Sequence, residues 1–368
     1  MHREDEPASV SAALAHRMRQ DIAAAGGWWP FDRFMAAALY TPELGYYAHG
    51  GVKFGALPEG GSDFITAPEL SPLFGRAVAT QVAQVLDAAG LDEVVEFGAG
   101  TGALAAQLLE ALGDRCRRYT IVELSASLRQ RQQERLAAFG ERVRWVDALP
   151  DRIEGVVVGN EVLDAMPVQL LHFDGARWLE RGVAVEEWRF VFADRPTDLR
   201  PPVEGPFLPG TVTEIHPQAR AFVATLAERL KRGATFFIDY GFPEAEYYHL
   251  QRHGGTLMCH RAHQADTDPL ADVGLKDITA HVDFTGIALA GQDAGLDVLG
   301  YTSQAHFLMN CGLPALLAQA PLRERIAAQK LIEEHEMGEL FKVVGFGRGL
   351  PDGFDPVGFA NGDRSHRL

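Results

Sequence analysis

The chain has 368 residues, of which 47% are hydrophobic, and its formal net charge is −16 at pH 7. This length suits one large or two modest domains, and the acidic charge gives no support for binding nucleic acid or an anionic membrane. The three cysteines form no C-x-x-C pair, so neither a disulfide framework nor a zinc site is expected. No apolar run resembles a signal peptide or reaches transmembrane length. These features predict a cytoplasmic protein without membrane insertion.

The first 90 residues are expected to form an N-terminal helical lid. Apolar residues recur at helical spacing over 8–25 and again over 32–39. A glycine-rich stretch at 48–62 is typical of a loop, and a third helix is predicted over 72–89, with an apolar stripe on one face. The rest of the chain, 91–368, is expected to form the main domain.

A glycine turn follows the first predicted strand of the main domain. Val94, Val95 and Phe97 favour a buried strand, and glycines stand at 98, 100 and 102, before a run of helix-forming residues. This spacing differs from the G-x-G-x-x-G of dinucleotide-binding proteins. The strand also ends with a carboxylate, Glu96, which suits a ligand with a cationic amine or sulfonium. The pattern indicates S-adenosylmethionine (SAM), as in class I methyltransferases; a βα turn without a ligand is the alternative.

Two further acids support a SAM site. Glu123 ends the apolar run 119–122, about 20 residues after the turn, where an acid binds ribose hydroxyls in nucleotide-binding folds. Asp147 follows the third predicted strand, 143–146, where SAM enzymes commonly contact the adenine amino group. The alternatives are a glutamate on the surface near a helix start and an aspartate before a turn.

The strand predicted at 155–159 ends in polar residues. Asn160, Glu161 and Asp164 follow it directly. Alternating strands and helices over 91–160 predict a parallel sheet, and such sheets bind ligands at the carboxyl ends of their strands. We therefore expect these three side chains to meet the transferred group. The alternative is that Asn160 caps a short helix whose dipole favours the two acids.

Residues 168–213 are expected to form a β-rich insertion. Two apolar runs flank Asp174-Gly175, which is a hairpin signal, and 187–192 adds a third strand. Such an arm could dimerise or cradle a substrate, so a homodimer is left open. A fifth buried strand, 234–241, then ends in Asp239-Tyr240-Gly241.

A second insertion, 242–282, is irregular and rich in histidine. The histidines lack a metal-ligand spacing, so no metal site is predicted. His281 and Asp283 are expected to reach the cofactor cleft, although Asp283 can also cap a helix. Beyond it we predict a strand at 297–301, a long helix at 313–336 and a closing strand at 340–346.

A series of sequence blocks resembles the MidA-like methyltransferase family, which includes a mitochondrial complex I assembly factor that methylates an arginine of a complex I subunit. The most specific blocks are D-F-I-T-A-P-E-L-S and G-N-E-V-L-D-A-M-P-V, at 63–71 and 159–168. Others are P-E-L-G-Y-Y, E-F-G-A-G-T-G, F-I-D-Y-G, D-I-T-A-H-V-D-F-T and M-G-E-L-F-K-V, at 42–47, 96–102, 237–241, 277–285 and 337–343. The resemblance implies an α/β, class I, Rossmann-like fold with a mostly parallel seven-stranded sheet and helices on both faces.

The same resemblance implies a SAM-dependent protein arginine methyltransferase. The candidate protein substrate is a subunit of a respiratory complex. The expected cofactor site comprises Glu96, Gly98, Ala99, Gly100, Gly102, Glu123, Leu124, Asp147, Asn160 and Glu161. A guanidinium is a poor nucleophile because it is protonated, and a carboxylate that clamps it orients one nitrogen. Glu161 is the first candidate for that role, and Asp164, Glu69 and Asp239 are the other candidates.

The expected substrate-binding residues are Glu69, Asp239, Tyr240, His281 and Asp283. Two other functions stay open. The chain could methylate a small molecule, or it could be a non-catalytic assembly factor that keeps SAM as a structural ligand.

Overall fold

The computed structural model describes residues 5–48, 65–261 and 264–368, so most of the predicted loop at 48–62 lies outside the described residues. The chain divides into two compact units. The first comprises 1–51, 164–219 and 244–283, and the second comprises 52–163, 220–243 and 284–368. No boundary between these units lies near residue 90, where the lid was expected to end.

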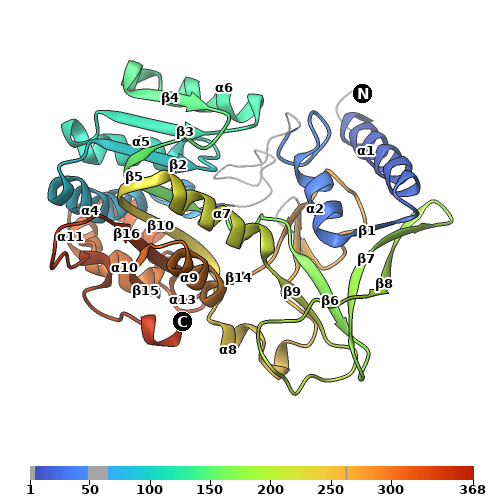
Figure 1. The fold of residues 1–368 in the computed structure, drawn as a ribbon. Coiled ribbons are helices and arrows are strands. Elements are labelled where there is room, and N and C mark those ends of the chain that lie inside the picture. The colour runs from blue at the N-terminus through green and yellow to red at the C-terminus, as the bar shows by residue number, and fades with distance from the viewer. Residues whose placement is uncertain (1–4, 49–64, 262–263) are drawn as a thin grey trace. The chain divides into compact units, whose positions relative to one another are not determined.

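The second unit is built on a mixed eight-stranded sheet. The seven strands within this unit run in the order β15-β16-β10-β5-β2-β3-β4 (Figure 1). Their bounds are β2 (Glu93–Phe97), β3 (Arg118–Val122), β4 (Val143–Val146), β5 (Ile153–Asn160), β10 (Leu230–Phe242), β15 (Asp297–Ser303) and β16 (Phe341–Arg348). The strands from β10 to β4 pair in parallel, whereas β16 is antiparallel to both β10 and β15. The α/β fold is confirmed, and the expected seven strands are corrected to a mixed sheet of eight.

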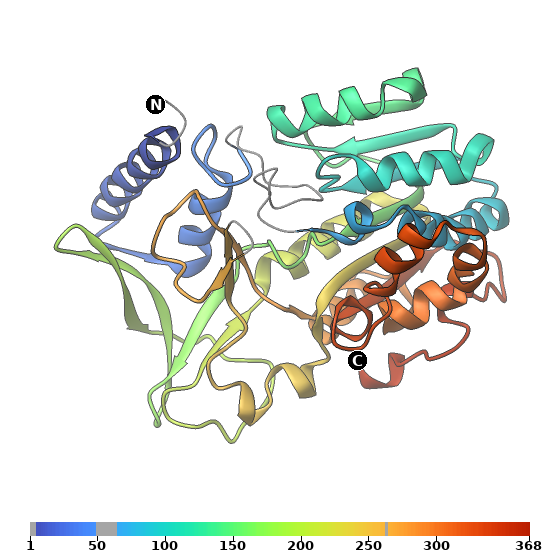
Figure 2. The same cartoon turned by 180° about the vertical axis from the view of Figure 1, so that it is seen from behind.

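Helices cover both faces of this sheet (Figures 1 and 2). Adjacent residues of a strand point to opposite faces. Accordingly, Phe237 of β10 contacts Phe222 of α7, while Phe236 contacts Phe307 of α10. The helices are α3 (Ala67–Leu70), α4 (Pro72–Ala89), α5 (Ala103–Leu112), α6 (Ala126–Arg135), α7 (Pro217–Arg229), α9 (Phe284–Asp293), α10 (Gln304–Asn310), α11 (Leu313–Gln319), α12 (Leu322–Gln329) and α13 (Met337–Leu340). Short 3₁₀ turns are η2 (Gly113–Arg115), η3 (Ala137–Arg142), η5 (Val357–Phe359) and η6 (Ser365–Arg367).

The long helix predicted over 313–336 is wrong. The structure has α11 and α12, which are separated at Ala320 and Pro321, and a turn follows α12. Proline lacks a backbone N–H and clashes with the preceding turn of a helix, so Pro321 ends one helix and stands just before the next.

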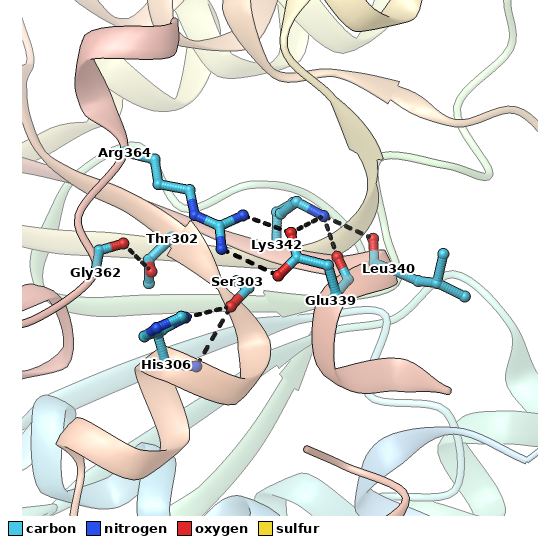
Figure 3. Close-up of polar contacts among 8 residues, drawn as sticks. All are labelled: Thr302, Ser303, His306, Glu339, Leu340, Lys342, Gly362 and Arg364. Atoms are coloured by element: carbon cyan, nitrogen blue, oxygen red, sulfur yellow. Dashed lines mark hydrogen bonds and ion pairs between the residues drawn. The ribbon is translucent and has the colours of Figure 1, made fainter. Parts of the chain in front are cut away.

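The C-terminal segment is fastened to the last strands of the second unit (Figure 3). Arg364 forms an ion pair with Glu339 of α13, and Thr302 donates a hydrogen bond of 2.6 Å to the carbonyl of Gly362. Lys342 also lies beside Glu339, at 3.7 Å. Burial raises the pKa of Glu339, but the Arg364 hydrogen bond and the two cations outweigh it and hold that pKa below its ordinary value. Glu339 is therefore stabilised as a carboxylate anion, and its ion pair with Arg364 holds the C-terminal segment against α13.

The first unit contains a five-stranded sheet and a smaller three-stranded one. In the larger sheet the order is β1-β7-β6-β9, with β8 on the other edge of β7, and α1 and α2 pack against it. The smaller sheet has the order β12-β11-β13. The strands are β1 (Trp28–Pro30), β6 (Gln169–Phe173), β7 (Trp178–Glu186), β8 (Arg189–Pro196), β9 (Val212–Ile215), β11 (Met258–Arg261), β12 (Gln264–Asp266) and β13 (Asp277–Thr279). The two-residue strand β14 (Val282–Asp283) is the eighth strand of the mixed sheet described above. The helices are α1 (Asp5–Ala24), α2 (Phe31–Tyr40), α8 (Glu244–Tyr247) and the 3₁₀ turn η4 (Leu250–Arg252).

The hairpin predicted around Asp174-Gly175 is confirmed. Phe173 of β6 pairs with Trp178 of β7, and β8 supplies the expected third strand. Within the described ranges, no helix has both the length and the apolar character needed to cross a bilayer.

Candidate functional site

The glycine turn joins β2 to α5. Gly98, Gly100 and Gly102 have φ values of 61°, 53° and 83°, a left-handed conformation that residues with a Cβ rarely adopt. At Gly98 a Cβ would also lie 3.1 Å from Cγ2 of Val162, which follows β5. The glycines therefore bring the turn close to the end of β5 and expose backbone N–H groups at the start of α5.

Glu96 is buried at the end of β2. It is 2% exposed and accepts a hydrogen bond of 2.6 Å from the hydroxyl of Tyr119 on the neighbouring strand β3. Burial raises the pKa of Glu96 to about 8; the Tyr119 hydrogen bond lowers it and the nearby charge of Glu123 raises it. A cationic group bound beside this carboxyl would favour its ionised form.

Glu123 is held by a residue that the sequence analysis missed. Gln132 of α6 is fully buried, and its Nε2 lies 2.9 Å from Oε2 of Glu123 and 2.9 Å from the carbonyl of Gly100. Trp145 of β4 donates to Oε1 of Gln132 at 3.0 Å. Burial raises the pKa of Glu123, although the hydrogen bonds from Ser125 and Gln132 oppose this. Gln132 thus connects the glycine turn with the acid expected to bind the ribose. Its one sequence signal is Leu128, one helical turn earlier on the same buried face.

The other expected cofactor residues lie at the ends of neighbouring strands. Leu124 and Asp147 are exposed directly after β3 and β4, and Ala99 is buried in the turn. Because β2, β3 and β4 are parallel, their carboxyl ends meet at one edge of the sheet. The fold therefore brings these positions to one edge, as expected for a ligand site in an α/β sheet.

The end of β5 forms a strained turn. Asn160 donates from Nδ2 to Oε1 of Glu161 at 3.0 Å, and its own Oδ1 is buried without a donor among the described residues. Glu161 has a φ of 54°, which is rare for a residue with a Cβ. No helix follows Asn160 in this described stretch, so the alternative that Asn160 caps a short helix is wrong.

Asp239 binds the backbone of this turn. It ends the buried part of β10, is 1% exposed, and accepts hydrogen bonds at Oδ2 from the backbone N–H groups of Val162 and Leu163, at 3.1 and 2.9 Å. Its Oδ1 accepts from the N–H of Tyr240 at 2.9 Å. The ring of Tyr240 stands edge-on to Phe341, with centroids 5.4 Å apart.

Glu69 contacts the glycine turn. It belongs to the short helix α3, and its Oε1 lies 2.7 Å from Nη1 of Arg135. Thr101, within the turn, hydrogen-bonds to both Glu69 and Arg135. Arg135 and Thr101 were not predicted as site residues. The contact places Glu69, from the D-F-I-T-A-P-E-L-S block, beside the glycine turn.

The first unit has a separate group of tyrosines and buried acids. Tyr47 donates to Asp277 at 2.8 Å, and Tyr40 donates to the carbonyl of Ala165, also at 2.8 Å. Tyr40 is 40% exposed as a residue, but the desolvation of its hydroxyl raises its pKa above the ordinary value, and the charges of Asp277 and Asp164 raise it further. Tyr40, Tyr47 and Asp277 were not predicted as site residues, although the P-E-L-G-Y-Y and D-I-T-A-H-V-D-F-T blocks contain two of them.

Two predicted substrate-binding residues, His281 and Asp283, follow Asp277 closely in the sequence. The N–H of His281 donates to Oγ1 of Thr256 at 3.1 Å, and Asp283 is buried in β14. Within the described residues, no group of three or more histidine, cysteine, aspartate or glutamate side chains could hold a metal ion.

A mixed α/β sheet with a left-handed glycine turn after β2 and acids at the strand ends defines a cofactor-dependent methyltransferase of class I. Residues 76–302, more than half of the chain, match the family model described as "Putative S-adenosyl-L-methionine-dependent methyltransferase". The chain therefore belongs to this methyltransferase family, and SAM is its cofactor.

Known proteins match this chain in sequence over most of its length. A zebrafish (Danio rerio) protein named "Protein arginine methyltransferase NDUFAF7, mitochondrial" is 28% identical over 91% of this chain and 86% of its own length. The Drosophila melanogaster homologue is 28% identical over 96% of this chain and 90% of its own. A Burkholderia thailandensis protein solved with S-adenosyl-homocysteine bound is 53% identical, covers 100% of this chain and 99% of its own, and has a TM-score of 0.95.

The location predicted from the sequence is wrong. The polar first residues and the widely separated cysteines suggested the cytoplasm, but the curated relatives are named as mitochondrial proteins. Reduced cysteines are also compatible with compartments other than the cytoplasm, so the cysteine argument was not specific.

Proposed function

We propose that this protein transfers the methyl group of SAM to an arginine side chain of a protein substrate. The observation that carries the proposal is the turn at the end of β5, where the strained Glu161 stands next to Asn160 and close to the glycine turn. The curated relatives are named protein arginine methyltransferases, which supports arginine as the acceptor.

Three observations on the described residues support a binding site for SAM. The turn has left-handed glycines that a Cβ would strain; among the described residues, Glu96 accepts a single side-chain hydrogen bond and Oδ1 of Asn160 is a buried acceptor without a donor. In the proposed cofactor site, Gly98, Ala99, Gly100 and Gly102 form the cradle. Glu123 binds the ribose of SAM. Glu96 and Asn160 bind other polar groups of SAM, and Leu124 and Asp147 flank its adenine base.

When bound, SAM supplies a methyl group on a positively charged sulfur. The residues of the chain must then hold the acceptor nitrogen in line and favour loss of its proton. We assign the clamping of the guanidinium to the carboxylate of Glu161, because one carboxylate can accept two parallel N–H bonds from a guanidinium. Tyr240, in the same unit as Glu161, is a further proposed acceptor residue. Asp164, the second candidate for the clamp, and His281 and Asp283 belong to the first unit and stay predictions from the sequence.

A protein substrate is consistent with the charge of the chain, since an acidic surface attracts basic segments that carry arginine. The resemblance to the MidA-like family makes a respiratory complex subunit the proposed class of target. A homodimer through the five-stranded sheet of the first unit is a further part of this proposal, because β8 forms an open edge of that sheet.

The test uses the purified full-length protein, radiolabelled SAM and an extract of cells that lack the enzyme. We expect one labelled protein, with the label mapped to arginine, and no label with the Gly100→Val variant, whose side chain would strain the turn. Glu161→Gln keeps an oxygen for the Asn160 contact, so it should bind SAM with near wild-type affinity by calorimetry and lose about 10²- to 10⁴-fold in turnover.

Three outcomes would contradict the proposal. Label on a small molecule would indicate a different acceptor. SAM binding without any methyl transfer would indicate an assembly factor. Unchanged turnover of Glu161→Gln would remove Glu161 from the clamp.

A further inference from the structure

The backbone of Glu161 is held in a conformation that its own side chain disfavours. Its φ of 54° lies in the left-handed region, where the Cβ of an L-residue is crowded. Such strain persists only where the surrounding structure enforces it, and it concentrates at functional sites.

Three successive N–H groups at this turn are bound by the end of β10. The N–H of Glu161 donates to the carbonyl of Ile238 at 2.9 Å. The next two, from Val162 and Leu163, both donate to the single oxygen Oδ2 of Asp239. Hydrogen bonds to an ionised carboxylate are stronger than those between neutral groups, and the buried position of Asp239 reduces competition from water.

We propose that Asp239 is a positioning residue: it holds the Glu161 turn in the left-handed conformation and so fixes the Glu161 carboxylate beside Asn160. The Asn160 contact, 3.0 Å from Nδ2 to Oε1, exists only while that turn keeps its shape. The catalytic consequence rests on the function proposed for Glu161, whereas the backbone linkage does not.

Direct binding of the acceptor by Asp239 is the competing role. A carboxylate has about four acceptor positions. Asp239 already accepts three backbone N–H bonds, from Val162, Leu163 and Tyr240. Little capacity is left for a bidentate contact with a guanidinium, so the geometry favours positioning over binding.

The first test measures the melting temperature of four proteins: the wild type, Glu161→Gly, Asp239→Ala and the double variant. Glycine tolerates the left-handed conformation, so Glu161→Gly should raise the melting temperature by about 2–4 °C in the wild-type background. This gain should shrink by about half or more in the Asp239→Ala background, where two of the three N–H bonds that hold the turn to β10 are lost. An equal change in both backgrounds would overturn the linkage.

The chain offers a matched control. Glu187, at the exposed turn between β7 and β8, is also left-handed, with a φ of 45°. Glu187→Gly should change the melting temperature by the same amount with and without Asp239→Ala. If Asp239→Ala does not fold, Asp239→Asn serves instead: hydrogen exchange of the Val162 and Leu163 amides should quicken about tenfold. Unchanged exchange would overturn the linkage.

The second test separates positioning from binding by kinetics. Asp239→Asn should lower kcat about 10- to 100-fold while leaving KM for SAM within about twofold, because the clamp is displaced but the cofactor turn is intact. In the Glu161→Gln background the same substitution should have little further effect. Equal, additive losses in both backgrounds would show that Asp239 acts on the acceptor directly. If thermal coupling is present but Glu161→Gln turns over normally, the proposed function of Glu161 fails and the backbone linkage stands.

Discussion

Two buried glutamates, one in each unit, are alike in burial and different in their partners. Glu96 of the second unit and Glu214 of the first are 2% and 1% exposed, and burial raises the pKa of both. Glu96 accepts one hydrogen bond from a side chain, that of Tyr119. Glu214 accepts several from its own unit: from the N–H groups of Thr256 and Leu257, at 2.8 and 3.1 Å, and from the hydroxyls of Tyr247 and Thr256, at 2.9 and 3.2 Å.

The difference separates structural acids from ligand-binding acids. Buried polar groups in native proteins are hydrogen-bonded, and an ionised carboxylate can accept about four bonds. Glu214 uses that capacity within the fold, so its role is to hold the segment after α8. Glu96 keeps most of its capacity at the strand end where we propose that the cofactor binds. Burial alone would not have distinguished the two.

The largest expected effect is on stability. Glu214→Ala removes the acceptor of Thr256, Leu257 and Tyr247, and we expect the free energy of unfolding to fall by about 3 kcal/mol. The matched variant Glu96→Ala leaves one hydroxyl without its partner and should cost about 1 kcal/mol. Urea denaturation of both variants measures the difference. Equal losses would break the distinction between the two acids.

The next effect is a pH dependence that belongs to Glu96. Its pKa rises from the ordinary 4.5 to about 8 in the folded chain, so the folded state binds this proton more tightly than the unfolded state. The stability that the protonated carboxyl contributes is complete below pH 4.5 and is lost as the pH rises toward 8. The slope should reach at most about 1.4 kcal/mol per pH unit.

Glu96→Gln is the control for this slope, because glutamine cannot titrate. The difference in unfolding free energy between wild type and Glu96→Gln should fall as the pH rises through that window. SAM binding at pH 7 should also release a proton from the wild type but not from the variant, seen as a buffer-dependent binding enthalpy. A constant difference across the window would refute the assignment.

The smallest effect concerns Glu69. Its ion pair with Arg135 involves an arginine side chain that is 39% exposed, and such pairs are worth less than about 1 kcal/mol. Because Thr101 of the glycine turn bonds to both partners, Glu69→Gln should weaken SAM binding about two- to fivefold by calorimetry. Glu154→Gln, which breaks a similar pair with Arg152, should leave the affinity unchanged. A loss tenfold or greater would place Glu69 in direct contact with the ligand.

Local signals in the sequence predicted the elements but not their partners. The glycine spacing after Phe97 and the Asp174-Gly175 hairpin follow from conformational preferences of neighbouring residues, so both were recognised. The division of the helix at Pro321 is also readable from the sequence, because proline does not continue a helix. By contrast, Tyr119 meets Glu96 across 23 residues, and Asp239 meets Val162 across 77. Such pairs depend on the order of strands in the sheet, which periodicity does not determine.

The unit boundaries illustrate the same limit. Three separate segments, 1–51, 164–219 and 244–283, form the first unit. Read along the chain, they look like part of a lid and two insertions, because no local pattern shows that a strand at 28–30 pairs with one at 182–184.

Trp145 gives the second unit its own optical reporter. The other tryptophans, at 28, 29, 178 and 188, all belong to the first unit. The Trp145 indole bonds to Gln132, which in turn bonds to Glu123 and to the carbonyl of Gly100. Fluorescence from a chain with phenylalanine at the other four positions would therefore follow cofactor occupancy in real time, without a label or a coupled assay.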